Sequence, residues 1–257
     1  MSTDAKGRLF ERMTDAVGWT GRSLAEEVEE LEDGWSIRTP SFPQVWSLNH
    51  LFLRSVSSPK TSLSLANRLQ EGLSFRHVQV VQQAKSLDEG AFARAGWRVD
   101  REVYMVLAGV PPRADVTGVC SLGPAEVTRL MGEWIEEDHP GIPAASRAQI
   151  EQASQLEGKL WDERAFGILD DQGNPVAVTK LRIGHGVAWV EDVFTSVSAR
   201  RLGHARRLVT HAVSRAANSD ADFTFIVADD NDWPKHLYAS IGFEAVGRTW
   251  TLHRETA

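Results

Sequence analysis

The chain has 257 residues, of which 42% are hydrophobic and 25% are charged, and its formal net charge is −7. These values predict a globular protein with one large domain or two of ordinary size, and they argue against disorder. The acidic balance argues against a general nucleic-acid binder, which usually carries a basic face. No stretch approaches the roughly 18 apolar residues of a membrane span, and the N-terminus lacks the apolar run of a secretory signal. We therefore expect a cytoplasmic protein whose partner is neither nucleic acid nor a membrane.

Disulfide and metal chemistry find little support in the sequence. Cys120 is the single cysteine, so neither a disulfide within the chain nor a cysteine-rich metal site can form. A catalytic thiol is the alternative, but the surrounding apolar run VTGVCSLG favours a buried structural cysteine. No two of the eight histidines have the His-x-x-x-His spacing of a helical metal site. We expect no catalytic metal.

The first half of the chain contains helix and strand patterns and ends in a proline-rich break. The Glu-rich residues 25–34 are interpreted as a solvated helix face, and residues 77–81 resemble a strand. Residues 108–115 (AGVPPRAD) form the clearest break, because paired prolines lack amide donors and favour extended backbone. We therefore predict one domain over residues 1–112 and a second over residues 116–257.

The second half predicts a regular succession of elements. They are two helices, a hairpin, a strand, an amphipathic helix and another strand, at residues 124–137, 147–158, 165–183, 186–197, 205–217 and 223–227. Strands on both sides of the amphipathic helix indicate a βαβ crossover, while the hairpin adds antiparallel strands. The predicted fold class is therefore α/β (α+β), with a mixed, mostly antiparallel twisted sheet flanked by helices.

The two halves resemble each other. Each reads as strand, helix, tight glycine turn and strand, and the pair Gly96-Trp97 matches Gly242-Phe243. A helical pattern at residues 62–73 further matches the one at 205–217. We interpret this likeness as a duplication, although two unrelated α/β modules could also match by chance.

The most informative stretch is the basic turn RRLGHA that links a strand to the amphipathic helix. Gly203 suits a turn with close backbone approach and unusual dihedral angles. The amides at the start of the following helix lack intrahelical partners and carry partial positive charge, which suits a phosphate. One of the two tyrosines, Tyr238, follows after the next strand. A phosphate cradle followed by a phenol suggests group transfer from a phosphate-bearing cofactor.

These residues resemble the GNAT superfamily of acyl-CoA-dependent N-acyltransferases, over about residues 116–257. The family signature Gln/Arg-x-x-Gly-x-Gly/Ala is met by Arg200, Gly203 and Ala205. An asparagine, a tyrosine seven residues later and a Gly-Phe pair follow, as in many members. The resemblance implies a GNAT fold in two tandem copies. The first copy is degenerate, because Phe92 stands where the second has Tyr238 and a Ser-Pro-Lys-Thr loop replaces the phosphate loop.

The resemblance also implies roles for individual residues. Tyr238 is expected to protonate the leaving thiolate, and a backbone amide, that of Val193, to stabilise the oxyanion. The remaining cofactor contacts are expected from strand backbone, from loop amides and from one side chain: Val193, Phe194, Thr195, Arg200, Arg201, Leu202, Gly203, His204, Ala205 and Asn231. Many members have glycine where this chain has Arg201, and this departure bears on cofactor affinity more than on fold.

Two catalytic assignments keep an alternative reading. Tyr238 could pack its ring on the core and leave its hydroxyl in water. Glu191 is a candidate base, direct or through water, but a solvated or hydrogen-bonded strand carboxylate is the competing interpretation. Alternation along the strand predicts that Glu191 and Asp192 point to opposite faces of the sheet.

The resulting functional hypothesis is transfer of an acetyl group from acetyl-CoA to a primary amine, carried by a small molecule or a peptide. A protein that binds acyl-CoA without turnover, as a sensor or partner-binding module, is the alternative from another class. A longer acyl donor is a third reading, as is the thiol-precursor amine that mycothiol synthase, also a tandem GNAT protein, acetylates. The acceptor carries no sequence motif, and a homodimer and a monomer are both left open.

Overall fold

The computed structural model describes residues 1–81, 87–110, 113 and 115–256, and the chain divides into two compact units. Unit 1 comprises Met1–Tyr104, Ala228–Asp232 and the chain from Ala245 onwards, and unit 2 comprises Met105–Val227 and Trp233–Glu244. This division differs from the predicted domains, because the last strand groups with the N-terminal residues. Pro111, Pro112 and Ala114 of the predicted linker lie outside the described residues.

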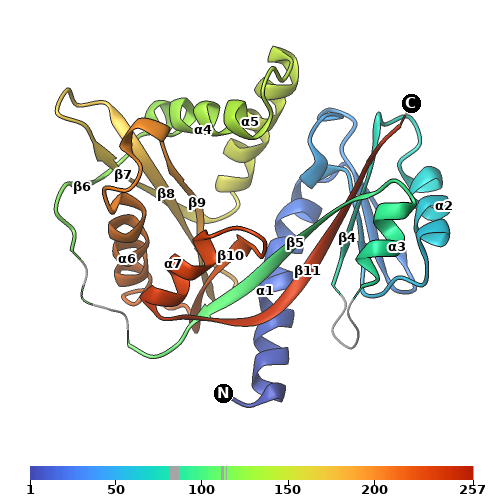
Figure 1. Ribbon diagram of the computed structural model, residues 1–257, viewed down its shortest axis with the longest axis horizontal. Helices are drawn as coiled ribbons and strands as arrows, with labels where there is room; N and C mark the ends of the chain where they lie inside the picture. The colour runs from blue at the N-terminus through green and yellow to red at the C-terminus, as the bar shows by residue number, and fades with distance from the viewer. Residues whose placement is uncertain (82–86, 111–112, 114, 257) are drawn as a thin grey trace. The chain divides into compact units, whose positions relative to one another are not determined.

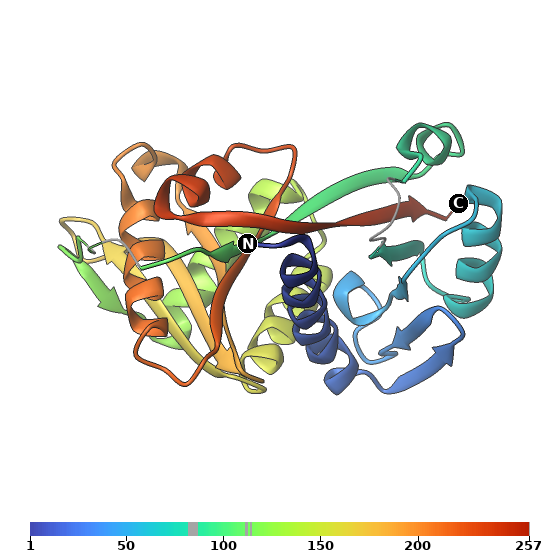
Figure 2. The same cartoon turned by 90° about the horizontal axis from the view of Figure 1, so that it is seen from below.

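Unit 1 contains a sheet in the strand order β1-β2-β3-β4-β11-β5. Its elements are α1 (Thr3–Leu24), β1 (Glu27–Leu31), β2 (Gly34–Arg38), η1 (Trp46–Leu48), β3 (Leu51–Leu53), α2 (Pro59–Leu69), β4 (Phe75–Val80), α3 (Glu89–Arg94), the first part of β5 (Arg98–Leu107) and most of β11 (Phe243–Glu255). Strands β3 and β4 pair in parallel, whereas β4 and β11 pair antiparallel. β5 and β11 run side by side in both views (Figures 1 and 2).

The helix predicted for the Glu-rich residues 25–34 is wrong. Helix α1 ends at Leu24, Ala25 turns to extended backbone, and Glu27–Leu31 forms a strand paired with β2. The glutamates that suggested a solvated helix face are instead exposed on an edge strand, where charge discourages pairing with another chain.

Unit 2 contains a sheet in the strand order β10-β9-β8-β7-β6, with the end of β5 beside β10. Its elements are β6 (Val119–Ser121), α4 (Pro124–Asp138), α5 (Ala144–Gly158), β7 (Asp162–Leu169), β8 (Pro175–Gly184), β9 (Val187–Thr195), η2 (Val197–Ala199), α6 (His204–Ala216), most of β10 (Phe223–Asp229) and α7 (Pro234–Ile241). Helix α6 lies on one side of β8 and β9, and α4 and α5 lie on the other (Figure 1). The mixed, mostly antiparallel sheet flanked by helices is confirmed.

Helix α6 is held on the sheet by the apolar stripe that its sequence predicts. Leu208, Val209, Ala212 and Val213 are fully buried, whereas Arg215 in its last turn is not. Residues three and four apart share a helix face, so this spacing places all four side chains against the sheet. The stripe fixes the direction of α6 and therefore where its N-terminus lies relative to β9.

The two halves repeat one succession of elements. β3-α2-β4-α3-β5 in the first half corresponds to β9-α6-β10-α7-β11 in the second, and in each a helix joins two parallel strands. Gly96 and Gly242, which end the short helices α3 and α7, both have positive φ (84° and 112°). Glycine reaches this region without strain. The structure therefore contains two copies of one module, as the likeness between the halves predicts.

No helix in the described part of the chain is long and apolar enough to cross a membrane.

Candidate active site

Strands β9 and β10 part near the middle of the sheet of unit 2. They pair in parallel from Val187 to Val190 and from Phe223 to Ile226, but β9 continues to Thr195. Beyond Val190 the described β9 backbone is not paired with β10. In the first half, by contrast, pairing between β3 and β4 extends to Leu53, the end of β3. An extended ligand can therefore align with β9 where it cannot align with β3.

A β-bulge lies in β9 where the two strands part. Val178 of β8 pairs with Phe194, but Lys180 pairs with Glu191, so Thr179 faces two residues of β9. Asp192, one of the two, has a φ of 52°, which is unusual for a residue other than glycine. Bulges re-aim side chains and interrupt strand pairing, and they are common beside active sites. This one reorients the backbone around Val193.

The loop after β9 runs through the short helix η2 and two residues with positive φ. Gly203 is left-handed (φ 79°, ψ 9°) and precedes the first residue of α6. Arg201 also has positive φ (66°), although it is not glycine. A residue with a Cβ atom is strained in this region. Arg201 stands where many GNAT members have glycine, and the backbone conformation at this position favours glycine.

Arg201→Gly is therefore expected to stabilise the protein. Relief of the left-handed strain, partly offset by the greater freedom of glycine in the unfolded chain, is expected to raise the free energy of unfolding by about 1 kcal/mol. Chemical denaturation of both proteins measures this change. Leu202→Gly is the matched control, because Leu202 has negative φ, and we expect it to be neutral or destabilising. Equal effects of the two substitutions would contradict the assigned strain.

The N-termini of α2 and α6 differ in the way expected of a degenerate and an intact phosphate site. In α2 the Ser58 hydroxyl accepts a hydrogen bond from the Thr61 amide (3.2 Å), which caps the helix. In α6 the N-cap is Gly203, no side chain caps the first turn, and that turn holds no acidic residue. Uncapped first-turn amides and the helix dipole together favour an anion. Of the two, only α6 keeps its first turn open for a phosphate.

Helix α4 fastens the loop through two carboxylates one turn apart. The Arg200 guanidinium donates to both oxygens of Glu137 (2.7 and 2.6 Å) and to the carbonyl of Thr195 (3.0 Å). The Ser196 hydroxyl donates to Glu133 (2.6 Å). Arg200 is thus placed in the loop as predicted, but its side chain is directed to α4. Glu133 and Glu137 could not be identified from the sequence, because the helix and the loop are some 60 residues apart.

The first residues of α6 can offer backbone amides. Burial and the nearby Arg207 lower the pKa of the His204 imidazole. Its Nδ1 lies 2.6 Å from the Arg207 guanidinium, which also donates to the Thr117 carbonyl. Leu202 is 64% exposed, and Ala205 follows His204 in the first turn. For these residues the structure favours backbone contacts with an anion over side-chain contacts.

Tyr238 lies in the middle of α7. Its side chain is 5% exposed, and its ring packs edge-on against Phe243 with the centroids 6.3 Å apart. Arg206, in the first turn of α6, donates to Ser240 of α7 (2.5 Å), which ties the two helices together near the uncapped turn. The corresponding residue in α3, Phe92, is 2% exposed and has no hydroxyl.

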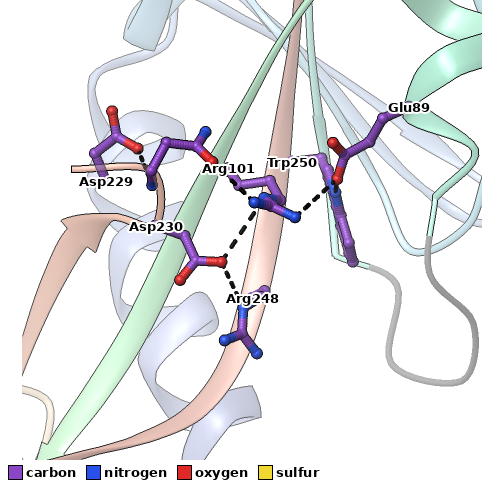
Figure 3. A network of polar contacts seen from close by, with 7 residues as sticks. Glu89, Arg101, Asp229, Asp230, Arg248 and Trp250 are labelled. Atoms are coloured by element: carbon purple, nitrogen blue, oxygen red, sulfur yellow. Dashed lines mark hydrogen bonds and ion pairs between the residues drawn. The ribbon is translucent and has the colours of Figure 1, made fainter.

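The Asn231 side chain is engaged by an arginine in unit 1. Its amide oxygen accepts a hydrogen bond from Arg101 of β5 (2.8 Å), and its backbone amide donates to Asp229 (2.7 Å) (Figure 3). Asn231 belongs to the residues that group with unit 1. Contact between this side chain and the cofactor stays a prediction, and it would have to replace or extend the bond to Arg101.

Arg101 belongs to a larger network around the buried Asp230 (Figure 3). The Asp230 carboxylate, 8% exposed, pairs with Arg248 (2.7 Å) and Arg101 (3.7 Å), and its amide donates to the Arg101 carbonyl. Glu89 accepts from the indole of Trp250 (2.8 Å) and pairs with Arg101 (3.4 Å). The turn after β10 is thus fixed by residues of β5 and β11.

Six charged side chains meet on the face of the sheet that α5 covers, and we call them the ion cluster. Arg182 is at its centre: it pairs with Glu163 (2.8 Å) and Glu157 (3.6 Å) and makes a short contact with Glu191. Lys180 pairs with Asp192 (2.8 Å) and donates to Ser154. The two cationic side chains are 1% and 3% exposed, and the carboxylates between 13% and 22%.

The predicted alternation of Glu191 and Asp192 is therefore wrong. Lys180 and Arg182 are two apart on β8 and share a face, and each pairs with one of the two consecutive carboxylates of β9. The bulge at Asp192 breaks the alternation that an unbroken strand would impose. The sequence signal for this cluster is the pair of cations, Lys180 and Arg182, spaced two apart within the apolar strand AVTKLRI.

The charges of the ion cluster do not balance. The cluster contains four carboxyl groups and two cations. When all four carboxyl groups are ionised, two excess negative charges remain in a partly dry site. Burial raises the pKa of the Glu191 carboxyl to about 8; Arg182 opposes this rise, while Asp192 and Glu157 add to it. Burial also raises the pKa of Glu157. A carboxyl in such a site can exchange a proton near neutral pH.

The stability of the protein should depend on pH through Glu191. Because the folded state holds this proton more tightly than the unfolded state, its contribution is complete below the unfolded pKa of 4.5 and is lost as the pH rises through about 8. In Glu191→Gln, which cannot ionise, the free energy of unfolding should fall less steeply over this range. Urea titrations at several pH values measure the slope; an identical slope in both proteins would contradict the assignment.

Comparison with known proteins identifies the class of this site. Residues 129–243 match the family model described as acetyltransferase (GNAT) family. They include β9, the loop, α6 and α7. This part of the chain therefore resembles the GNAT family, whose general activity is acyl transfer. None of the curated proteins matches the chain significantly.

Solved structures show the same fold over nearly the whole chain. A conserved protein of unknown function from Staphylococcus epidermidis has a TM-score of 0.70 at 12% identity, covering 91% of this chain and 95% of its own. A GCN5-related N-acetyltransferase from Kribbella flavida has a TM-score of 0.60 at 18% identity, covering 96% of both chains. A tandem GNAT protein from the clavulanic acid biosynthesis pathway has a TM-score of 0.53 at 14% identity, covering 99% and 97%. The fold is that of a tandem GNAT protein.

Among the described residues, no group of three or more His, Cys, Asp or Glu side chains is arranged to hold a metal ion.

Proposed function

We propose that this protein is an N-acetyltransferase that moves an acetyl group from acetyl-CoA to a primary amine by direct attack of the amine on the thioester. The observation that carries the proposal is the parting of β9 and β10 beside the uncapped first turn of α6. This arrangement offers backbone groups to an extended arm and amides to a pyrophosphate. The first half lacks both features, which favours one active site, in the second half.

The residues of β9 and α7 supply the proposed chemistry. The amide of Val193, beyond the bulge, stabilises the negative charge that grows on the carbonyl oxygen during attack. Glu191 accepts a proton from the amine, directly or through water, and Tyr238 protonates the departing thiolate. A carboxyl with a raised pKa and a largely buried phenol are suited to these roles. The partly exposed carboxylates beside Val193 favour a cationic amine, carried by a small molecule or a peptide.

A charge placed in the first turn of α6 tests the cofactor site. Ala205→Glu should weaken acetyl-CoA binding by about tenfold or more, because a carboxylate there repels the pyrophosphate. The same substitution should leave the protein as stable as before, since an acidic residue suits a helix N-terminus. Isothermal titration calorimetry with acetyl-CoA measures the affinity, and denaturation measures the stability.

Ala145→Glu is the matched control, because Ala145 is the second residue of α5 as Ala205 is of α6. The affinity of the Ala145→Glu variant for acetyl-CoA should equal that of the natural protein. If the natural protein does not bind acetyl-CoA at millimolar concentration, the proposed function is refuted. If both variants lose affinity equally, the phosphate does not lie at α6.

A protein that binds acyl-CoA without turnover is the second candidate, favoured by the Arg182 contact that occupies Glu191. A screen of amines, amino acids, aminoglycosides and peptide N-termini, followed by release of free CoA, separates the two candidates. Release above background hydrolysis with any acceptor rules out the binding-only function. Donor chain length is tested in the same assay with longer acyl-CoA compounds.

A further inference from the structure

Arg182 is not a residue that the fold alone explains. Its side chain is 1% exposed, in a strand whose neighbours Leu181 and Val178 are fully buried. A buried charge is costly to bring out of water, and replacing a whole buried ion cluster by apolar side chains of similar size is often neutral or stabilising. The guanidinium also lies over the Trp189 ring, 5.3 Å from its centroid. A side chain fixed this firmly beside a catalytic strand suggests a role in the chemistry.

The contacts of Arg182 come from three neighbouring elements. Glu157 of α5 and Glu163 of β7 hold the guanidinium on one side, and Glu191 of β9 contacts it on the other. Glu191 precedes the bulge at Asp192, and Val193 follows. The contact therefore fixes the Glu191 carboxylate two residues before the backbone amide that is proposed to hold the oxyanion.

We propose that Arg182 is a positioning residue for acyl transfer: it holds the Glu191 carboxylate at the bulge of β9 and governs whether that carboxylate carries a proton. The inference rests on the proposed function and deepens it. The charged groups that face Glu191 come from α5, β8 and β9: Glu157, Lys180, Arg182 and Asp192.

The proton balance of the transfer explains why it is useful for Arg182 to govern the protonation of Glu191. The amine nitrogen forms a bond to the thioester carbon, and the bond from carbon to sulfur breaks. A cationic amine first releases one proton to solvent. The proton that its nitrogen then loses on bond formation goes to Glu191, the thiolate takes a proton from Tyr238, and exchange with solvent restores both groups. Without Arg182 the pKa of Glu191 would rise above about 8, so still less of the carboxyl would be charged and able to accept a proton near neutral pH. With Arg182 the charged form is accessible near pH 8.

The test measures the titration of Glu191 directly. Carbon NMR of protein labelled at its glutamate carboxyl groups follows each titration, and Glu191→Gln identifies the resonance. In Arg182→Gln the midpoint of Glu191 should rise by about 1 to 3 pH units, because the cation in contact is lost. Glu157→Gln should lower it, because a neighbouring negative charge is lost. Arg164→Gln, on the solvated pair with Asp162, is the control and should leave it unchanged.

If Arg182→Gln does not fold, the double variant Arg182→Gln/Glu163→Gln replaces it. This variant leaves the net charge of the ion cluster unchanged but still removes the contact with Glu191. Its Glu191 midpoint should also rise relative to the natural protein. An unchanged midpoint in the folded single or double variant would overturn the proposal.

The second readout is the pH dependence of CoA release in the presence of an active amine. The acidic limb of kcat/KM should move upward with the NMR midpoint in the Arg182 variant and should disappear in Glu191→Gln. If the acidic limb of the kcat/KM profile does not move with the NMR midpoint of Glu191, the role of Arg182 in transfer is overturned. If no amine gives CoA release but the midpoints move as expected, the control of Glu191 by Arg182 stands, and it is the proposed function that fails.

Discussion

Tyr238→Phe is expected to lower kcat by about a hundredfold, while the affinity for acetyl-CoA stays within about twofold of its original value. General acid catalysis contributes roughly 10² to 10⁴ in rate, and a thiolate needs a proton less than an alkoxide does, so the lower end applies. Phenylalanine keeps the ring contact with Phe243 and removes only the hydroxyl. Steady-state CoA release gives kcat, and calorimetry gives the affinity.

The chain offers a matched control for this substitution, because it has only two tyrosines. Tyr104 is 1% exposed and packs edge-on against Phe10 of α1, in unit 1. Tyr104→Phe removes the same hydroxyl from a buried ring and should leave kcat unchanged. A full rate in Tyr238→Phe would remove the phenol from the mechanism. An equal loss in both variants would show that the effect is structural.

Arg182→Met is expected to lower the free energy of unfolding by about 3 to 5 kcal/mol, the largest change in stability that we predict. Methionine fills similar space in the strand but leaves Glu157, Glu163 and Glu191 buried without the cation they share. The cost arises from the uncompensated carboxylates, because the pair itself contributes little net stability over an apolar replacement. Urea denaturation at pH 9, above the pKa of about 8 of the Glu191 carboxyl, measures the change.

Arg164→Met is the comparison for this prediction. Arg164 lies on β7 and pairs with Asp162 at 2.7 Å, but both side chains are about half exposed. A solvated pair of this kind contributes about 1 kcal/mol or less. The loss in Arg182→Met should also shrink toward low pH, where the carboxylates are protonated. A pH-independent loss, or equal losses in the two variants, would contradict the assigned cause.

Much of the candidate site is local in sequence and could therefore be predicted from it. The strand that ends at Thr195, the turn at Gly203 and the helix from His204 follow from hydrophobic spacing and turn chemistry within some twenty residues. The same is true of the capped start of α2 at Ser58, which marks the half without a phosphate loop. Hydrogen bonds and dihedral preferences between near neighbours decide all of these features.

The positions of Glu191 and Asp192 could not be predicted in this way. Alternation is a property of an unbroken strand, and the bulge depends on how β9 registers with β8. The partners of these carboxylates lie on α5, β7 and β8, so only the folded sheet brings them together. The raised pKa of Glu191 is likewise a consequence of burial and of neighbours distant in sequence.

The sequence by itself determined the succession of elements, the two-copy plan and the half that keeps a phosphate loop, because these features depend on spacing along the chain. Only the tertiary structure decided which residues form each compact unit, that Arg200 is tied to Glu137, and that an arginine holds the candidate base. The physical reason is the same in each case. Strand pairing and buried charge are set by contacts between distant segments, and their free energies depend on the dry surroundings that folding creates.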